Sequence, residues 1–151
     1  MTVLLWQVLL AMGATGGFAV LFNAPPRVLL ICAAIGGAAF FVRSMLVSVG
    51  LSLDVATLLG ATAVGVLGEW GARRYRVPAL VFKVTGFIPF IPGVLAYQTV
   101  LQLLDGNYVD GLASGVQAVV RAGAIAGGIG TVTALVRLRP QSAQPARKHS
   151  C

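Results

Sequence analysis

Five apolar stretches, each long enough to cross a lipid bilayer as a helix, constrain what this chain can fold into. Short segments rich in charge, proline or glycine separate them, and they cover residues 2–22, 28–49, 55–72, 79–104 and 111–136. A helix of about 20 apolar residues spans the hydrocarbon core, and backbone in lipid must satisfy its own hydrogen bonds. We therefore expect an all-α integral membrane protein, a bundle of about five transmembrane helices with the fourth interrupted by prolines.

The composition excludes a water-soluble domain. Hydrophobic residues make up 58% of the chain and charged residues only 10%, whereas soluble domains carry about 25% charged residues. So few charges cannot form a polar shell. Residues 1–136 are expected to form one transmembrane helical domain, and residues 137–151 a basic, disordered cytoplasmic tail.

The connections between the spans differ in charge. With five spans, one side receives all the basic residues outside the spans: Arg27, Arg73, Arg74, Arg76, Arg137, Arg139, Arg147 and Lys148. The opposite side receives Asp54, Asp105 and Asp110, with Asp54 expected to cap the third helix. Because short loops rich in Lys and Arg stay in the cytoplasm, the pattern predicts an external N-terminus and a cytoplasmic C-terminus in a bacterial inner membrane.

The motif GFIPFIPG, residues 86–93, lies inside the fourth span. Proline has no N–H, so Pro89 and Pro92 remove the usual partners of the Thr85 and Ile88 carbonyls. The motif starts about 10 Å from Ala79 and reaches about 20 Å, near the bilayer centre. Two interpretations stay open: a packing kink, or an interrupted helix of the kind that forms substrate sites in transporters. The second assigns substrate contacts to Pro89, Pro92, Gly93, Tyr97 and Thr99.

Three cations fall inside the predicted spans. Lys83 is expected either to reach the cytoplasmic surface or to pair with Glu69, the only acid inside a predicted span. Arg43 and Arg121 then lack an acidic partner in this chain, and Arg121 facing lipid costs at least ~2.5 kcal/mol. Three alternatives remain for the charges of Arg43 and Arg121: contact with backbone carbonyls, contact with a partner subunit, or binding of a substrate carboxylate between the two arginines. The first two alternatives predict only a scaffold.

Small residues recur at the spacing that lets membrane helices approach closely. Gly36 and Gly37 stand together in the second span, and Gly123 and Gly127 form a GAIAG motif in the fifth. We interpret these glycines as packing positions. They suggest more contacts than five helices alone supply, and therefore an oligomer.

The chain carries no pattern typical of an enzyme. It contains no nucleophile with an adjacent base, no phosphate-binding loop and no acid pair. The two cysteines, Cys32 and Cys151, and the one histidine, His149, lack metal-ligand spacing. We expect no enzymatic activity, no cofactor and no metal. We explain the net charge of +7 by the basic residues that set the topology, which also attract anionic lipids, and not by nucleic-acid binding.

Three segments carry a family resemblance: FNAPPRVLLICAAIGG (22–37), the run from 48 to 82, and above all GFIPFIPGVLAYQTV (86–100). Over most of residues 3–136 the chain resembles the small, YjjB-like subunit of the threonine/serine exporter family. The resemblance implies ion-gradient-driven export of small amino acids, or of dicarboxylates such as succinate, together with a larger YjjP-like subunit. The alternative is a non-transporting membrane scaffold or assembly subunit for a partner protein.

Overall fold

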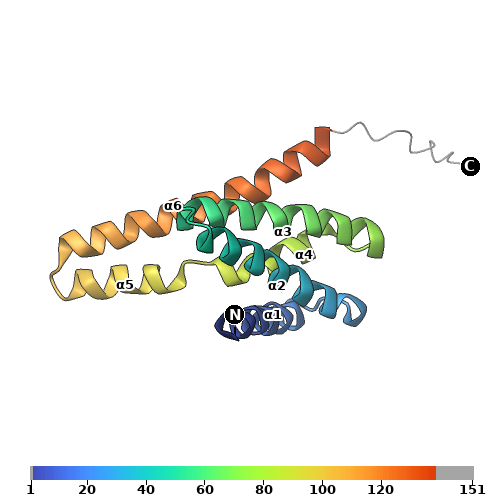
Figure 1. Cartoon of the computed structure of the whole chain (residues 1–151), viewed down its shortest axis with the longest axis horizontal. Coiled ribbons are helices and arrows are strands. Elements are labelled where there is room, and N and C mark those ends of the chain that lie inside the picture. Colours follow the sequence, from blue (N-terminus) through green and yellow to red (C-terminus); the bar gives the residue numbers. More distant parts are fainter. Residues whose placement is uncertain (1, 139–151) are drawn as a thin grey trace, which may run out of the picture.

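The computed structural model describes residues 2–138, all of whose regular structure is helical (Figure 1). The elements are α1 (Thr2–Leu21), α2 (Pro26–Ser48), α3 (Leu53–Tyr75), α4 (Ala79–Phe87), the 3-10 helix η1 (Ile88–Phe90), α5 (Gly93–Leu104) and α6 (Tyr108–Leu138). Four helices are long and apolar enough to cross a membrane, or five if α4–η1 and α5 together form one bent span. The predicted fold class is confirmed. Of the predicted tail, residues 139–151 lie outside the described part.

Several helices begin earlier than predicted. Pro26 is the first residue of α2, where a missing N–H costs nothing because the first-turn donors have no partner within the helix. Ser52 is the N-cap of α3, so Asp54 lies in the first helical turn and its predicted capping role is wrong. Asp54 in the first turn of α3 and Arg73 in its last turn both interact favourably with the helix dipole.

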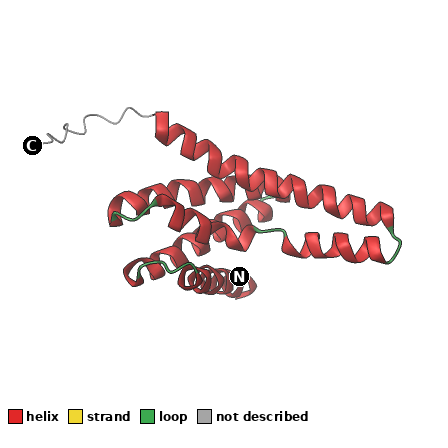
Figure 2. Cartoon of the chain, turned by 180° about the vertical axis from the view of Figure 1, so that it is seen from behind, coloured by secondary structure: helices red, strands yellow, loops and turns green. Residues whose placement is uncertain are grey.

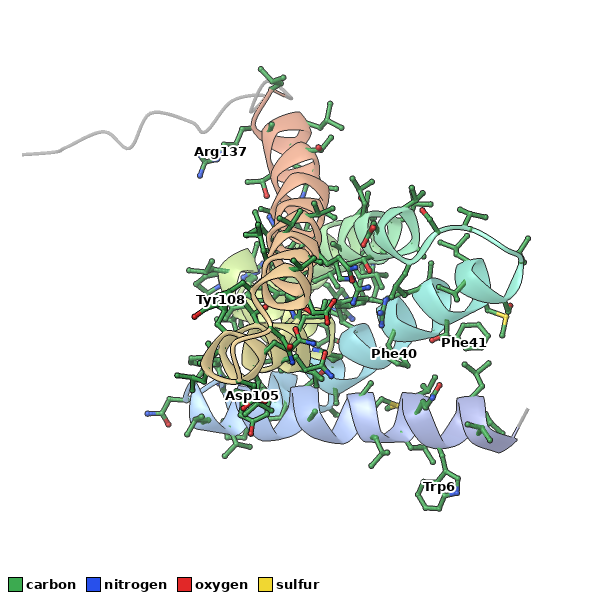
Figure 3. All side chains as sticks on the ribbon, turned by 90° about the vertical axis from the view of Figure 1, so that its left-hand side faces the viewer. Trp6, Phe40, Phe41, Asp105, Tyr108 and Arg137 are labelled. Carbon is green, nitrogen blue, oxygen red and sulfur yellow. The ribbon has the colours of Figure 1, made fainter. Side chains whose placement is uncertain are left out.

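The order of packing follows the chain until α6 returns to the middle. α1 packs on α2, α2 on α3, α3 on α4 and α5 on α6, while α6 also lies along α3 (Figures 1 and 2). Figure 1 looks down α1, whereas Figure 3 shows it along its length, so α1 crosses the direction of α3 and α6. Trp6 on α1 points away from the other helices (Figure 3) and is exposed, as expected of a lipid-facing side chain.

The basic connections gather at one end of the domain. Ala24 and Val28 belong to the same buried cluster as Phe82, and Tyr75 packs against that cluster. The start of α2, which contains Arg27, therefore lies beside the connection between α3 and α4. Arg137 shares a cavity with the first turn of α4. This arrangement is what the predicted topology requires; the orientation across the membrane itself stays a prediction.

The hairpin of α5 and the first half of α6 projects beyond the other helices (Figures 1 and 2). We call this hairpin, residues 93–120, the arm. None of the residues of α5, all of them described, is buried. Gly106 turns the chain between the two helices with a φ of +81°, a conformation that glycine adopts without strain. Asp105 and Asp110 lie at the far end of the arm, whereas Asp54 lies at the start of α3. The three acidic residues therefore lie at different depths along the helix bundle.

Candidate functional site

The proline motif bends the fourth span but satisfies its own carbonyls. The axes of Ala79–Phe90 and Gly93–Leu104 differ by 50°. The N–H of Ile88 donates to the Thr85 carbonyl, and the N–H of Ile91 donates to the Ile88 carbonyl at 3.2 Å. The usual partners are lost as predicted, yet 3-10 hydrogen bonds replace them. The two carbonyls are thus satisfied within the bend itself.

Arg43 on α2 lies directly against this bend. Its guanidinium carbon is 5.7 Å from the ring centroids of both Phe40 and Phe90, and Phe90 belongs to η1 (Phe40 is labelled in Figure 3). The Nε of Arg43 donates to the Thr57 hydroxyl at 3.2 Å. Among the described residues, no acid lies within ion-pair distance of Arg43. Two aromatic faces and one hydroxyl thus take the place of a counter-ion.

Arg121 on α6, in contrast, has an acidic partner. Its Nε lies 3.2 Å from Oδ1 of Asp54, so the prediction that Arg121 lacks an acid in this chain is wrong. The cause is the early start of α3, which places Asp54 beside the middle of α6. Arg43 and Arg121 contact Thr57 and Asp54, which lie one helical turn apart on α3, so the two positive charges lie close to each other. We call the group of Arg43, Asp54, Thr57, Phe90 and Arg121 the arginine cluster.

The other predicted site residues divide between the bend and the arm. Pro89 and Pro92 are partly buried on either side of Phe90, and Gly93 begins α5. Tyr97 is 66% exposed. Thr99 donates to the Leu95 carbonyl and faces Gly115 of α6. The structure therefore brings Arg43 and Arg121 together beside the prolines, while Tyr97 and Thr99 lie on the arm.

A second polar cluster lies toward the basic end of the same helices. Lys83 on α4 is only 6% exposed, forms an ion pair with Glu69 on α3 and donates to the Thr133 hydroxyl on α6 at 2.8 Å. The predicted pairing with Glu69 is confirmed, and the alternative of reaching the surface is wrong. We call Glu69, Lys83 and Thr133 the lysine cluster. Sequence reasoning did not identify Thr133, which is one of several threonines on helices.

A tight apolar layer separates the two clusters. Asp54 and Glu69 are 15 residues apart on α3, or about 22 Å. Between them, a Cβ added to Gly128 of α6 would lie 2.6 Å from the carbonyl oxygen of Leu58, and one added to Gly65 would lie 3.0 Å from Val132. The helices touch here along their backbones. Charge is thus confined to two levels of the α3–α6 contact.

The comparisons with known proteins decide the family. A family model described as "Threonine/Serine exporter, ThrE" matches residues 7–135. This chain belongs to that family. It is similar to an uncharacterized protein of Haemophilus influenzae, with 32% identity over 102 residues, which are 68% of this chain and 34% of that protein. No solved structure matches.

The exporter family has two implications for the geometry. The family is described as one of exporters, so charged clusters between the helices are candidate solute contacts. In addition, the aligned part of this chain spans about a third of the length of the curated relative that it matches.

Proposed function

We propose that this chain is a membrane subunit of a secondary exporter of small carboxylate-bearing metabolites, threonine and serine or a dicarboxylate such as succinate, in the bacterial inner membrane. The observation that carries the proposal is the charge of the arginine cluster. Arg43 and Arg121 supply two positive charges and Asp54 only one negative charge. A cluster with one excess positive charge inside a membrane domain attracts an anion.

The donors of the cluster suit a carboxylate. A guanidinium has five N–H donors, and the hydrogen bond from Arg43 to the Thr57 hydroxyl, at 3.2 Å, uses only Nε. The terminal nitrogens of Arg43 are suited to hold a carboxylate in a bidentate manner. Arg121 also binds the substrate carboxylate once its ion pair with Asp54 has opened.

The bend between η1 and α5 allows the site to change conformation. Phe90 covers the Arg43 guanidinium, and Pro92 separates Phe90 from the arm. A change in the 50° angle would move Phe90 off Arg43 and expose the guanidinium. Gly93 then acts as the flexible end of the bend, and Tyr97 and Thr99 line the outward path along α5.

We further propose that a larger, YjjP-like subunit covers the arm. Gly36 and Gly37 of α2 pack against Thr15 and Met12 of α1, as predicted for packing glycines. The GAIAG glycines of α6 differ, because a Cβ added at 123 or 127 meets no described atom within 4 Å outside its own helix backbone. This open face of α6 begins just beyond the arm, and α5 in the arm has no buried residue; both features support contact with another membrane helix.

A non-transporting scaffold remains the second candidate, and one observation favours it. The ion pair between Arg121 and Asp54 neutralises a charge that would otherwise need a substrate. Arg43 distinguishes the two candidates, because its charge has no such acid among the described residues. A scaffold should tolerate loss of that charge.

Efflux measurements test the proposal. Cells loaded with threonine, serine or succinate would express the chain with or without its larger partner, and rates would be normalised to assembled complex. We expect export of at least one solute only when both are present. Arg43→Gln should lower that rate about tenfold or more, since charged hydrogen bonds contribute about 1.5–3 kcal/mol. Arg74→Gln, at an exposed position, is the matched control. No export by the complex would favour the scaffold.

A further inference from the structure

The lysine cluster contains the three groups that complement a small hydroxy amino acid. We propose that Glu69, Lys83 and Thr133 bind such a zwitterion: Glu69 takes the ammonium group, Lys83 the carboxylate and Thr133 the side-chain hydroxyl. This inference rests on the proposed export function. It adds a second binding site, distinct from the arginine cluster and about 22 Å from it along α3.

An open cavity gives a solute access to these groups. Its volume is about 510 Å³, and its lining includes Glu69, Lys83, Thr133, Phe87 and Arg137. Small-molecule sites occupy about 300–1,000 Å³. Glu69 also borders a second open cavity of about 690 Å³, formed between α3 and α6. The carboxylate is therefore reachable although Lys83 itself is almost fully buried.

The ion pair between Lys83 and Glu69 suits exchange with a zwitterion. A buried ion pair adds little stability over apolar residues of the same size, but removing one partner is strongly unfavourable. A zwitterion replaces one ion pair with two, so no buried charge is left unpaired. A carboxylate without an ammonium group would leave Glu69 unpaired, and an amine without a carboxylate would leave Lys83 unpaired. The pair therefore selects against both.

Thr133 adds recognition of a hydroxyl group. Its own proton goes to the Ile129 carbonyl at 2.8 Å, and its oxygen accepts from Nζ of Lys83 at 2.8 Å. When Lys83 turns to a substrate carboxylate, this oxygen becomes free to accept a hydrogen bond from the substrate hydroxyl. The arrangement favours serine or threonine over alanine.

The surroundings of the cavity suit the loading of a solute from the basic end. Arg137, labelled in Figure 3, lines the cavity from α6, and Arg73 borders the neighbouring cavity from α3. With Lys83, these cations outnumber the carboxylate of Glu69. They attract the carboxylate of an approaching solute. If the basic end is cytoplasmic, the lysine cluster is the first of two binding positions on an outward route.

A ligand series tests the site without any mutation. Calorimetry would use the full chain in lipid nanodiscs, alone and with its partner, and four solutes: L-serine, L-alanine, L-lactate and ethanolamine. Relative to serine, L-alanine lacks the hydroxyl group and ethanolamine lacks the carboxylate, while L-lactate lacks the ammonium group and carries its hydroxyl on the α-carbon. We expect alanine to bind about threefold to tenfold more weakly than serine, and lactate and ethanolamine more than about tenfold more weakly. Lactate or ethanolamine binding as tightly as serine would overturn the proposal.

A matched pair of threonines on α6 tests the hydroxyl contact. Thr131 and Thr133 each donate to the carbonyl one turn earlier, at 2.7 and 2.8 Å, but Thr131 is exposed and only Thr133 meets Lys83. Thr133→Val should lower the ratio of serine to alanine efflux about threefold to tenfold. Thr131→Val should leave it unchanged. An unchanged ratio in Thr133→Val contradicts the assignment.

A paired neutral variant separates failure of the site from failure of the function. Glu69→Gln combined with Lys83→Gln leaves no unpaired buried charge, and should retain assembly while serine efflux falls at least about tenfold. If the wild-type complex exports serine and this variant exports it equally well, the lysine cluster is not a substrate site although export stands. If the wild-type complex exports no solute, the proposed function fails, and the ligand series in nanodiscs still decides the site. A variant that fails to assemble leaves the decision to the ligand series and the threonine pair.

Discussion

Arg121 and Asp54 form an ion pair across 67 positions of sequence, with Nε 3.2 Å from Oδ1. The contact joins the first turn of α3 to the middle of α6, just where the arm leaves the other helices (Figure 1). The side chain of Arg121 is 23% exposed and that of Asp54 is 48% exposed. The pair is therefore accessible enough for a solute carboxylate to compete with Asp54, which is the exchange that the proposed function requires.

The two partners of this pair should behave differently when each is neutralised. Arg121→Gln should lower efflux about tenfold or more, because it removes a donor to the carboxylate. Asp54→Asn should instead lower the half-saturating internal concentration of substrate, because it removes the competitor. Efflux from proteoliposomes over a range of loaded concentrations would measure both. The same loss in both variants would indicate a structural pair and no exchange.

Replacing both prolines of the bend should straighten the fourth span. Pro89→Ala with Pro92→Ala restores two N–H donors and allows a continuous helix. Spin labels at the exposed positions 80 and 104 should move apart, and efflux should fall while membrane insertion is unchanged. Pro78→Ala, at the N-cap of α4, is the control that should alter neither distance nor efflux. An unaltered distance in the double variant would show that tertiary contacts, not the prolines, set the angle.

Neighbouring glycines of α6 should tolerate alanine to different degrees. A Cβ at 128 would lie 2.6 Å from the Leu58 carbonyl oxygen, whereas one at 127 meets no described atom within 4 Å outside its own helix backbone. Gly128→Ala should therefore destabilise the single chain by about 1–3 kcal/mol. Gly127→Ala should not, and alanine even favours the helix by about 1 kcal/mol. Thermal unfolding in nanodiscs would compare them, and equal midpoints would rule out the close α3–α6 contact.

A larger side chain at the same open position tests the proposed partner contact. Gly127→Leu should leave the folding of the isolated chain intact but reduce co-purification of the larger subunit, because close helix approach needs small residues. The exposed Ala122 on the same helix provides a control through Ala122→Leu. Undiminished co-purification of the Gly127 variant would place the partner on another face.

Cysteine labelling tests the orientation. In a Cys151→Ser background, an impermeant maleimide on intact cells should label Asn107→Cys, whereas Arg74→Cys should react only after permeabilisation. The reason is the gathering of the basic connections at one end, and the positive-inside rule predicts that this end is cytoplasmic. Cys32 is buried and should contribute little background. The opposite pattern would invert the route proposed for the solute.

The sequence predicted the number and type of spans well, because these depend on local properties. Apolar length identifies each helix, and Pro89 with Pro92 identifies the bend. The partner of Lys83 was also accessible to sequence reasoning, since Glu69 was the one acid within a predicted span. Each of these inferences needs only the neighbours of a residue along the chain.

The contacts of Arg121 were not accessible in the same way. Asp54 was placed in a loop by an error of two residues in the start of α3, where Ser52 rather than Asp54 is the N-cap. More importantly, the relative height of two helices is set by tertiary packing, here by Gly128 against Leu58. Thr133 was missed for the same reason. A threonine becomes a candidate only once α6 is known to return beside α3 and α4.

The order of the charges along the chain has a consequence for biosynthesis. Both acids, Asp54 and Glu69, precede the cations with which they pair, Arg121 and Lys83. The ribosome therefore delivers each carboxylate before the helix that carries its counter-ion. Inserting a lone Lys or Arg at a helix centre costs about 2.5–3.5 kcal/mol, and a carboxylate already in the membrane offsets part of that cost. We therefore expect α3 to assist the insertion of α4 and α6, the two helices that carry these cations.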